Sequence, residues 1–223
     1  MKSKVLVVAV HPDDETLGCG GALLKHKANG DEIHWLICTA MHEKNGFSQS
    51  VIKKRKKEID AVAELYAFDN THHLDLNAMK VDEYAMSDLI AKLSLVIKVV
   101  QPGVIYLPFK GDVHSDHRKI FEAAYSCTKS FRYPFIRKIL MMETLSETEF
   151  APSTKEDSFI PNYFVDISDF FEKKIKIMRC FESEIDEHPF PRSERNIRAL
   201  ATLRGATAGC EFAEAFMLLK EIV

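Results

Sequence analysis

Short apolar runs alternate with amphipathic segments along the chain, and this alternation constrains the fold more than any other feature of the sequence. The first run, Val5–Val10, is continuously apolar and rich in β-branched residues, as expected for a strand buried on both faces. The segment Glu15–Ala28 follows as a predicted helix and ends at Asn29-Gly30, a typical helix stop. Strand–helix units at this spacing predict an α/β fold with a mostly parallel sheet and helices on both faces.

The same periodicities predict the other elements. Further strands are expected at Glu32–Thr39, His72–Leu74, Val104–Leu107, Lys138–Met142 and Tyr163–Ile167. Further helices are expected at Val51–Tyr66, Asp82–Val100, His117–Lys129, Ser168–Phe181, Arg195–Arg204 and Glu211–Ile222. The polar segment Glu143–Pro161 is expected to form a long loop or an irregular strand insertion. Because no stretch resembles a linker, residues 1–223 are predicted to form a single domain.

The charge balance and the cysteines exclude several classes of partner. The 30 basic and 33 acidic side chains give a net charge of −3, and this balance does not indicate a protein that binds nucleic acid. The five cysteines are scattered and odd in number, a pattern typical of free thiols in a reducing compartment. The run Val5–Val10 is too short to span a membrane, and no secretory cleavage site follows it. We therefore expect a cytoplasmic protein with no membrane partner, and the sequence also allows a homo-oligomer.

A first cluster of metal-ligating residue types stands where the first predicted strand ends. His11-Pro12-Asp13-Asp14 follows that strand directly, and in open α/β sheets the carboxyl ends of strands are where ligands bind. A helix cap accounts for one carboxylate, but not for a histidine with two adjacent aspartates. A hydrolytic zinc site uses three His or Asp/Glu ligands, and a carboxylate that is not bound to the metal accepts a proton from water. The motif can supply two ligands and the base.

A second cluster stands at the end of the strand Val104–Leu107. There Asp112, His114, Asp116 and His117 lie within six positions, and the two histidines are three apart. One histidine can bind a metal while the other donates a hydrogen bond to a developing oxyanion, and Asp116 can orient an imidazole. The alternative is an ordinary helix start with solvated histidines. Two such clusters at matching positions in the sheet favour one shared metal site.

Both clusters resemble a known family. The stretch from Ala9 to Gly21, reading AVHPDDETLGCGG, is similar to the signature of the PIG-L/LmbE-like deacetylases. The resemblance continues in the second cluster and near the C-terminus, in Arg204-Gly205 and Ala213–Phe216. Members of this family are zinc-dependent enzymes with a Rossmann-like fold that remove the acetyl group from N-acetylglucosaminyl substrates. The resemblance therefore implies a metal-dependent N-deacetylase acting on a small amino-sugar conjugate.

The resemblance also implies a role for individual residues. His11, Asp14 and His117 would bind one Zn²⁺, with Fe²⁺ as the alternative metal. Asp13 would be the general base and later the acid that protonates the leaving amine, His114 would stabilise the oxyanion, and Asp116 would orient a histidine. Arg55 and Asp75 would contact the substrate, although the stretch after Leu74 departs from the usual family loop.

Two other classes of protein compete with this interpretation. A phosphoesterase also uses His/Asp clusters, but a two-metal site usually needs more ligands than these motifs supply. A nucleotide-binding Rossmann module without hydrolytic activity is the other alternative, although the glycines at 18, 20 and 21 do not fit the G-x-G-x-x-G spacing.

Overall fold

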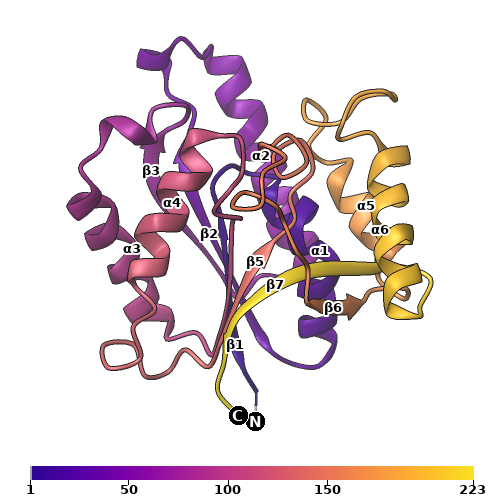
Figure 1. The fold of residues 1–223 in the computed structure, drawn as a ribbon. Helices are drawn as coiled ribbons and strands as arrows, with labels where there is room; N and C mark the ends of the chain where they lie inside the picture. Colours follow the sequence, from indigo (N-terminus) through magenta and orange to yellow (C-terminus); the bar gives the residue numbers. More distant parts are fainter. Residues whose placement is uncertain (1) are drawn as a thin grey trace.

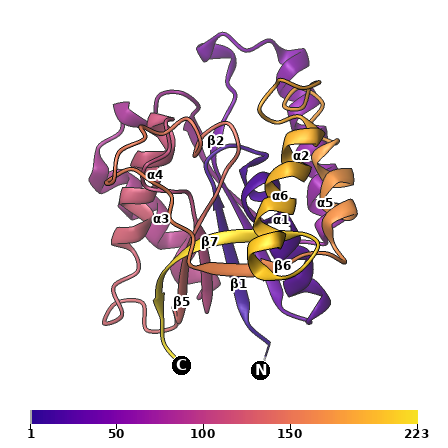
Figure 2. The same ribbon diagram turned by 45° about the vertical axis from the view of Figure 1, so that its right-hand side comes forward.

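The computed structural model describes residues 2–223. Within this range, seven strands form one sheet in the order β3-β2-β1-β4-β5-β7-β6, and helices cover both of its faces (Figures 1 and 2). The strands are β1 Lys4–Ala9, β2 Glu32–Ala40, β3 Asn70–Asn77, β4 Val104–Leu107, β5 Lys138–Met142, β6 Tyr163–Asp166 and β7 Ala213–Glu221. The helices are α1 Asp14–Ala28, α2 Gln49–Tyr66, α3 Met86–Val100, α4 Ser115–Ser126, α5 Phe171–Met178 and α6 Glu194–Ala208, with short 3₁₀ turns at η1 Glu43–Asn45 and η2 Val81–Glu83.

Two apolar layers attach the helices to the sheet. Val5, Val7 and Ala9 of β1 face the layer that holds α1, α2, α5 and α6, whereas Leu6 and Val8 face the layer that holds α3 and α4. This alternation along one strand is what a strand buried on both faces requires. The mostly parallel α/β fold predicted from the sequence is confirmed, because strands β3, β2, β1, β4 and β5 pair in parallel.

Strand β1 lies at the point where the chain changes direction across the sheet. It pairs in parallel with β2 on one side and with β4 on the other. The loops that follow β1 and β4 therefore leave the same edge of the sheet and lead to helices on opposite faces. A crevice at such a switch point is where open α/β sheets bind ligands.

The last element differs from its prediction. Residues Ala213–Glu221 form strand β7 and not the expected helix over Glu211–Ile222. Alanine, glutamate, leucine and lysine favour helices, but that preference is weak against tertiary pairing. Strand β7 pairs antiparallel with both β5 and β6, and Phe216 packs on Tyr106 in the core. Without β7, the short β6 would have no neighbour in the sheet.

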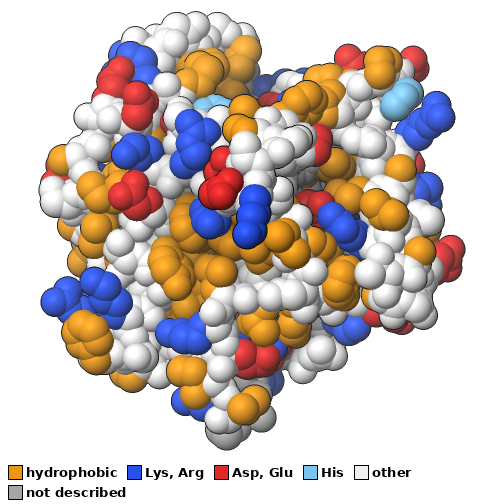
Figure 3. All heavy atoms as spheres, in the orientation of Figure 1, with side chains coloured by type: hydrophobic (Ala, Val, Ile, Leu, Met, Phe, Trp, Pro, Cys, Tyr) orange, Lys and Arg blue, Asp and Glu red, His pale blue; other side chains and the backbone are white. Residues whose placement is uncertain are grey.

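Several element boundaries also differ from their predictions. Strand β3 is longer than His72–Leu74 because its polar residues pair with β2 at the sheet edge, and α5 is shorter than Ser168–Phe181. The five cysteines are free. None of the helices within residues 2–223 has both the length and the apolar character needed to cross a bilayer. On the face drawn in Figure 3, basic and acidic side chains are interspersed.

A buried ion pair holds helix α1 at a kink. Cys19 has φ −147° and ψ 23°, which are not helical values, so α1 consists of two short helices in tandem. The ammonium group of Lys174 lies 2.7 Å from the Glu214 carboxylate, and both side chains are buried. Three backbone groups beside the kink bond to this pair, namely the N–H groups of Gly21 and Ala22 to Glu214 and the carbonyl of Leu17 to Lys174. The pair therefore replaces the hydrogen bonds that the kink removes from α1.

Replacing Glu214 by alanine is expected to lower the free energy of unfolding by about 3–5 kcal/mol, because it leaves the Lys174 ammonium buried without its partner. The matched control is Glu221→Ala. Glu221 lies on β7, as Glu214 does, but its ion pair with Lys138 of β5 is more exposed. The control should cost at most about 1 kcal/mol. Urea denaturation measures both values, and equal losses for the two variants would contradict the role given to the buried pair.

Candidate metal centre and active site

Three potential metal-ligating atoms converge at the switch point. His11 follows β1, Asp14 begins α1, and His117 lies in the first turn of α4. His117 Nε2 lies 3.3 Å from His11 Nδ1 and 3.4 Å from Asp14 Oδ2, and the latter two atoms are 3.9 Å apart. The structure thus brings together two segments that are separated by about a hundred positions, as a shared site requires.

The second nitrogen of each imidazole faces a carboxylate. His117 Nδ1 lies 2.9 Å from Asp112 Oδ2, and His11 Nε2 lies 3.3 Å from Asp116 Oδ2. An ionised carboxylate only accepts hydrogen bonds, so we assign the ring proton of each neutral histidine to the nitrogen that faces it. When both rings are neutral, the two nitrogens that face each other carry lone pairs and form a triangle of acceptors with Asp14 Oδ2. In the metal-free protein at neutral pH, the raised pKa of His117 keeps a proton on its Nε2, which a metal would replace.

This triangle fits a divalent cation. Two imidazole nitrogens and one carboxylate oxygen are the donor set of many catalytic zinc sites. Ligand atoms about 2.0–2.2 Å from a tetrahedral ion lie about 3.3–3.6 Å from one another. The distances in the triangle are 3.3, 3.4 and 3.9 Å, close to that range. Three ligands on one side of such an ion leave a position for water or substrate.

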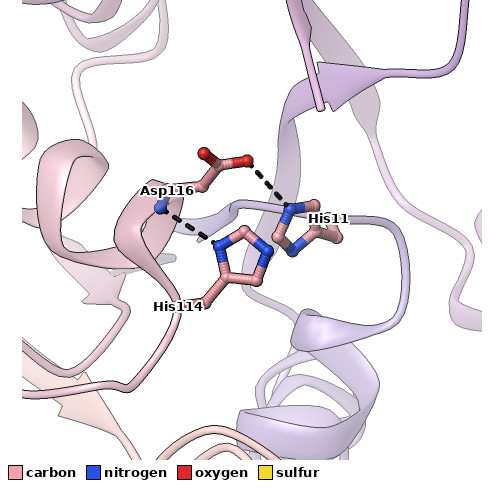
Figure 4. Close-up of side chains that lie close together, drawn as sticks. All are labelled: His11, His114 and Asp116. Carbon is pink, nitrogen blue, oxygen red and sulfur yellow. Dashed lines mark hydrogen bonds and ion pairs between the residues drawn. The ribbon is translucent and has the colours of Figure 1, made fainter. Parts of the chain in front are cut away.

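A second group of potential ligands shares His11 with the first. Potential ligand atoms of His11, His114 and Asp116 also lie within 4.8 Å of one another (Figure 4). The hydrogen bonds of Asp116 account for this group without a metal. Its carboxylate accepts the backbone N–H groups of Met79 and Val81 as well as His11, and its own N–H donates to His114 Nδ1. We therefore favour the triangle of His11, Asp14 and His117.

The backbone of Asp13 holds its carboxyl group away from the position of a helix cap. Asp13 has φ 134°, a value that few residues other than glycine adopt, and its side chain forms no cap with α1. Its N–H donates to Glu15 Oε2, and Glu15 is fully buried. Glu15 in turn accepts the hydroxyl of Thr16, which accepts the hydroxyl of Tyr66. This buried chain fixes the strained turn, so that Asp13 lines the pocket beside the triangle.

Asp13 and His114 have the protonation properties of a general base and a neutral donor. Burial, together with the neighbouring charge of Asp14, raises the pKa of Asp13 well above its usual value, so its carboxylate is a stronger base than that of an exposed aspartate. Burial lowers the pKa of His114, and the nearby imidazole of His11 lowers it further. Because His114 Nδ1 accepts the N–H of Asp116, the proton of this neutral ring is on Nε2. His114 can therefore donate a hydrogen bond into the pocket.

The structure adds two residues that were given no role from the sequence. Asp112 is fully buried, bonds to His117 and accepts the Thr148 hydroxyl at 2.7 Å. The sequence signal that was available for this contact is that Asp112 lies in the same short cluster as His117. Glu147 lines the pocket, and its Oε2 is buried without a hydrogen-bond partner. It comes from the irregular segment after β5, where no periodic pattern distinguishes it from its neighbours.

The two residues expected to contact substrate differ in their surroundings. Arg55 is buried, and its guanidinium bonds to the carbonyl of Pro12, to Ser183 and to the carboxylates of Glu58 and Glu184. These contacts make Arg55 a support for the turn after His11, and they leave few of its donors for a substrate. Asp75 is exposed at a bulge in β3 with φ 52° and lines the pocket.

Asp112→Asn is expected to weaken metal binding by about 10–100-fold, because the carboxylate that orients His117 and increases its basicity is lost. Asp82→Asn, on the exposed turn η2, serves as the control and should not change the affinity. Competition with a metal-binding dye measures both. An unchanged affinity in Asp112→Asn would contradict the placement of His117 in the metal centre.

Metal affinity is also expected to rise with pH. Burial lowers the pKa of His117, but the carboxylates of Asp14 and Asp112 outweigh burial and raise it to about 9. In metal-depleted protein, the stability contributed by this proton is fully present below about pH 6.5 and is lost as the pH rises through about 9. A metal at Nε2 must displace the proton, so the affinity should increase about tenfold per pH unit from about 7 to 9. Calorimetric titrations with Zn²⁺ between pH 7 and 9 measure this dependence. An affinity that does not change with pH would contradict the prediction.

Comparison with known proteins supports the fold and shows the family to which the chain belongs. A family model described as PIG-L, GlcNAc-PI de-N-acetylase, matches residues 6–128. This range includes His11, Asp14 and His117. A diacetylchitobiose deacetylase from Thermococcus kodakarensis is 26% identical over 220 residues, covering 95% of this chain and 81% of that protein. The N,N'-diacetylchitobiose deacetylase of Pyrococcus horikoshii has a TM-score of 0.77 at 21% identity, covering 98% of this chain and 84% of that chain.

The same fold also occurs in a protein that is described as a hydratase and not as a deacetylase. The 4-carboxy-2-hydroxymuconate hydratase of Pseudomonas putida KT2440 has a TM-score of 0.75 at 20% identity, covering 100% of this chain and 98% of that chain. At this identity the likeness shows the fold alone. The reaction must therefore be inferred from the site and from the family, and not from the architecture.

Proposed function

Because the chain belongs to the PIG-L family, described as GlcNAc-PI de-N-acetylases, we propose that it is a zinc-dependent hydrolase that removes the acetyl group from an N-acetylglucosamine-type conjugate. The observation that carries this proposal is the triangle of His11, Asp14 and His117 beside Asp13 and His114 in one pocket. The products are a free amino sugar and acetate. The cytoplasmic location expected from the free thiols stays a prediction.

The proposed reaction divides the work between a metal and side chains of this chain. A divalent metal, when bound by His11, Asp14 and His117, supplies Lewis acidity toward the acetamide carbonyl and toward water. Asp13 accepts the proton of the attacking water. Nε2–H of His114 donates a hydrogen bond to the oxygen that becomes negative, a contribution worth about 3–4 kcal/mol for single donors in other enzymes.

Collapse of the tetrahedral adduct breaks the C–N bond. The proton held by Asp13 passes to the leaving nitrogen, so that a neutral amine and acetic acid are released. Acetic acid then gives its proton to the amine in water, which leaves acetate and the ammonium form of the amino sugar. Asp116 keeps His114 in the donating tautomer through its backbone N–H and contacts His11 through its carboxylate. In this account Asp116 is a positioning residue.

The proposal is tested by measuring acetate release from a panel of N-acetylglucosaminides, with the metal content determined on the same preparation. We expect one zinc per chain and the release of one acetate per amine formed. Two metals per chain, with activity on phosphate esters only, would instead favour the phosphoesterase alternative. Nucleotide binding by a preparation that takes up no metal would favour a non-hydrolytic module.

A further inference from the structure

The pocket above the triangle is larger and more apolar than one acetamido sugar requires. Its volume is about 630 Å³. His11, Asp13, Asp14 and His114 line one end, which we call the reaction end. The pocket continues from there between the end of β2, the segment after η1 and helix α2.

One wall of this continuation consists of aliphatic, thioether and aromatic side chains, whereas Thr39, His73 and Asp75 add polar groups elsewhere in the lining of the pocket. We call this wall the apolar arm, and it is formed by Ile37, Met41, Phe47, Ile52 and Ile59. Ile52 and Ile59 are seven positions apart on α2, so they lie on the same face of that helix. Both are only partly buried, which leaves apolar surface available to a ligand.

The side chains of the apolar arm offer no hydrogen-bond donor and no strong acceptor. A second sugar or an inositol in the arm would lose water from its hydroxyl groups without gaining partners from these side chains. Each polar group buried without a partner is unfavourable, whereas each buried methylene is favourable. The chemistry of the arm therefore favours an alkyl or aryl group over a polyol.

The charged residues that line the pocket do not favour an anionic group either. Arg55 is bonded to Glu58 and Glu184, and Arg192 is bonded to Glu184 and to the hydroxyl of Ser146. Both guanidinium groups are therefore neutralised by carboxylates of the chain itself. On the same face of α2, the exposed Lys56 is followed four positions later by the exposed Asp60, so this edge of the pocket carries no net charge.

We propose that the substrate is an N-acetylglucosaminide whose aglycone is an apolar alkyl or aryl group, bound in the apolar arm while the acetamide lies at the reaction end. This inference rests on the proposed function, because it assigns the substrate class of the same site. It places substrate selection on α2 and on the segment that ends at Phe47, away from the triangle.

The test measures kcat/KM of the zinc-loaded enzyme for three substrates. These are methyl N-acetylglucosaminide, hexyl N-acetylglucosaminide below its critical micelle concentration, and N,N'-diacetylchitobiose. We expect kcat/KM for the hexyl glycoside to exceed both other values by at least tenfold, mainly through a lower KM. Ile52→Asn should reduce the hexyl-to-methyl ratio by about tenfold. The control is Val51→Asn, one position earlier on α2, where the side chain is exposed and does not line the pocket; it should leave the ratio unchanged.

The possible results separate the inference from the function on which it rests. Equal kcat/KM values for the three substrates, or a preference for diacetylchitobiose, would overturn the apolar aglycone and leave the deacetylase intact. A hexyl preference that is the same in Ile52→Asn as in Val51→Asn would also overturn it, because the selection would then lie elsewhere. No acetate from any of the three by enzyme with bound zinc would overturn both proposals.

Discussion

His117→Ala is expected to lose both its bound metal and all measurable acetate release. His117 Nε2 lies within 3.4 Å of both other atoms of the triangle, so its removal leaves one imidazole and one carboxylate, too few to hold a catalytic zinc ion. The removal also leaves the buried carboxylate of Asp112 without its imidazole partner. Metal content by atomic emission and acetate release should therefore fall together.

His114→Ala is the matched comparison for this loss. The two histidines are three positions apart, but only His117 belongs to the favoured triangle. The variant His114→Ala should keep one metal per chain while kcat falls by about 10²–10³-fold, the usual effect of removing one oxyanion donor. Stoichiometric metal in His117→Ala, or lost metal in His114→Ala, would show that the ligand set is wrong.

Asp13→Asn is expected to lower kcat by about 10²–10⁴-fold while the metal stays bound, the range seen when a general acid–base group is removed. Asparagine is the sharpest replacement because it keeps the size of aspartate and tolerates a positive φ better than alanine does. The backbone N–H of position 13 can still donate to Glu15, so the turn should be preserved.

The readouts for Asp13→Asn are single-turnover acetate release and metal content. Asp82→Asn, on the exposed turn η2, is the control for the aspartate-to-asparagine change and should behave as the unmodified enzyme. Loss of zinc in Asp13→Asn would mean that Asp13 is a ligand and not the base. Retained turnover with zinc bound would remove Asp13 from the proton transfer altogether.

The parts of the fold that local pattern determines could be predicted from the sequence. The continuous apolar run at Val5–Val10 and the breaks at Asn29-Gly30 and Pro102-Gly103 are local signals, and strands β1, β2 and β4 lie where these signals place them. The C-terminal strand could not be predicted in this way. Its residues favour a helix individually, and only pairing with β5 and β6, far away in the sequence, makes them a strand.

Some residues of the site could be predicted from local motifs, and others could not. The two His/Asp clusters could be found because their residue types are crowded into short motifs at strand ends. Glu147 and the surroundings of Arg55 could not, because they depend on contacts between distant segments. The family resemblance implies that Arg55 contacts substrate, which stays a prediction, and the structure pairs its guanidinium with Glu184, about 130 positions later in the chain. A sequence pattern carries no signal for such a pairing.

The most direct test of the proposed metal centre is a crystal structure of the zinc-loaded protein with anomalous diffraction at the zinc edge. We expect a single anomalous peak about 2.0–2.2 Å from His11 Nδ1, Asp14 Oδ2 and His117 Nε2, with Asp13 and His114 beside it but not bound to it. A peak bound instead by His11, His114 and Asp116, or a second peak of equal height nearby, would contradict it.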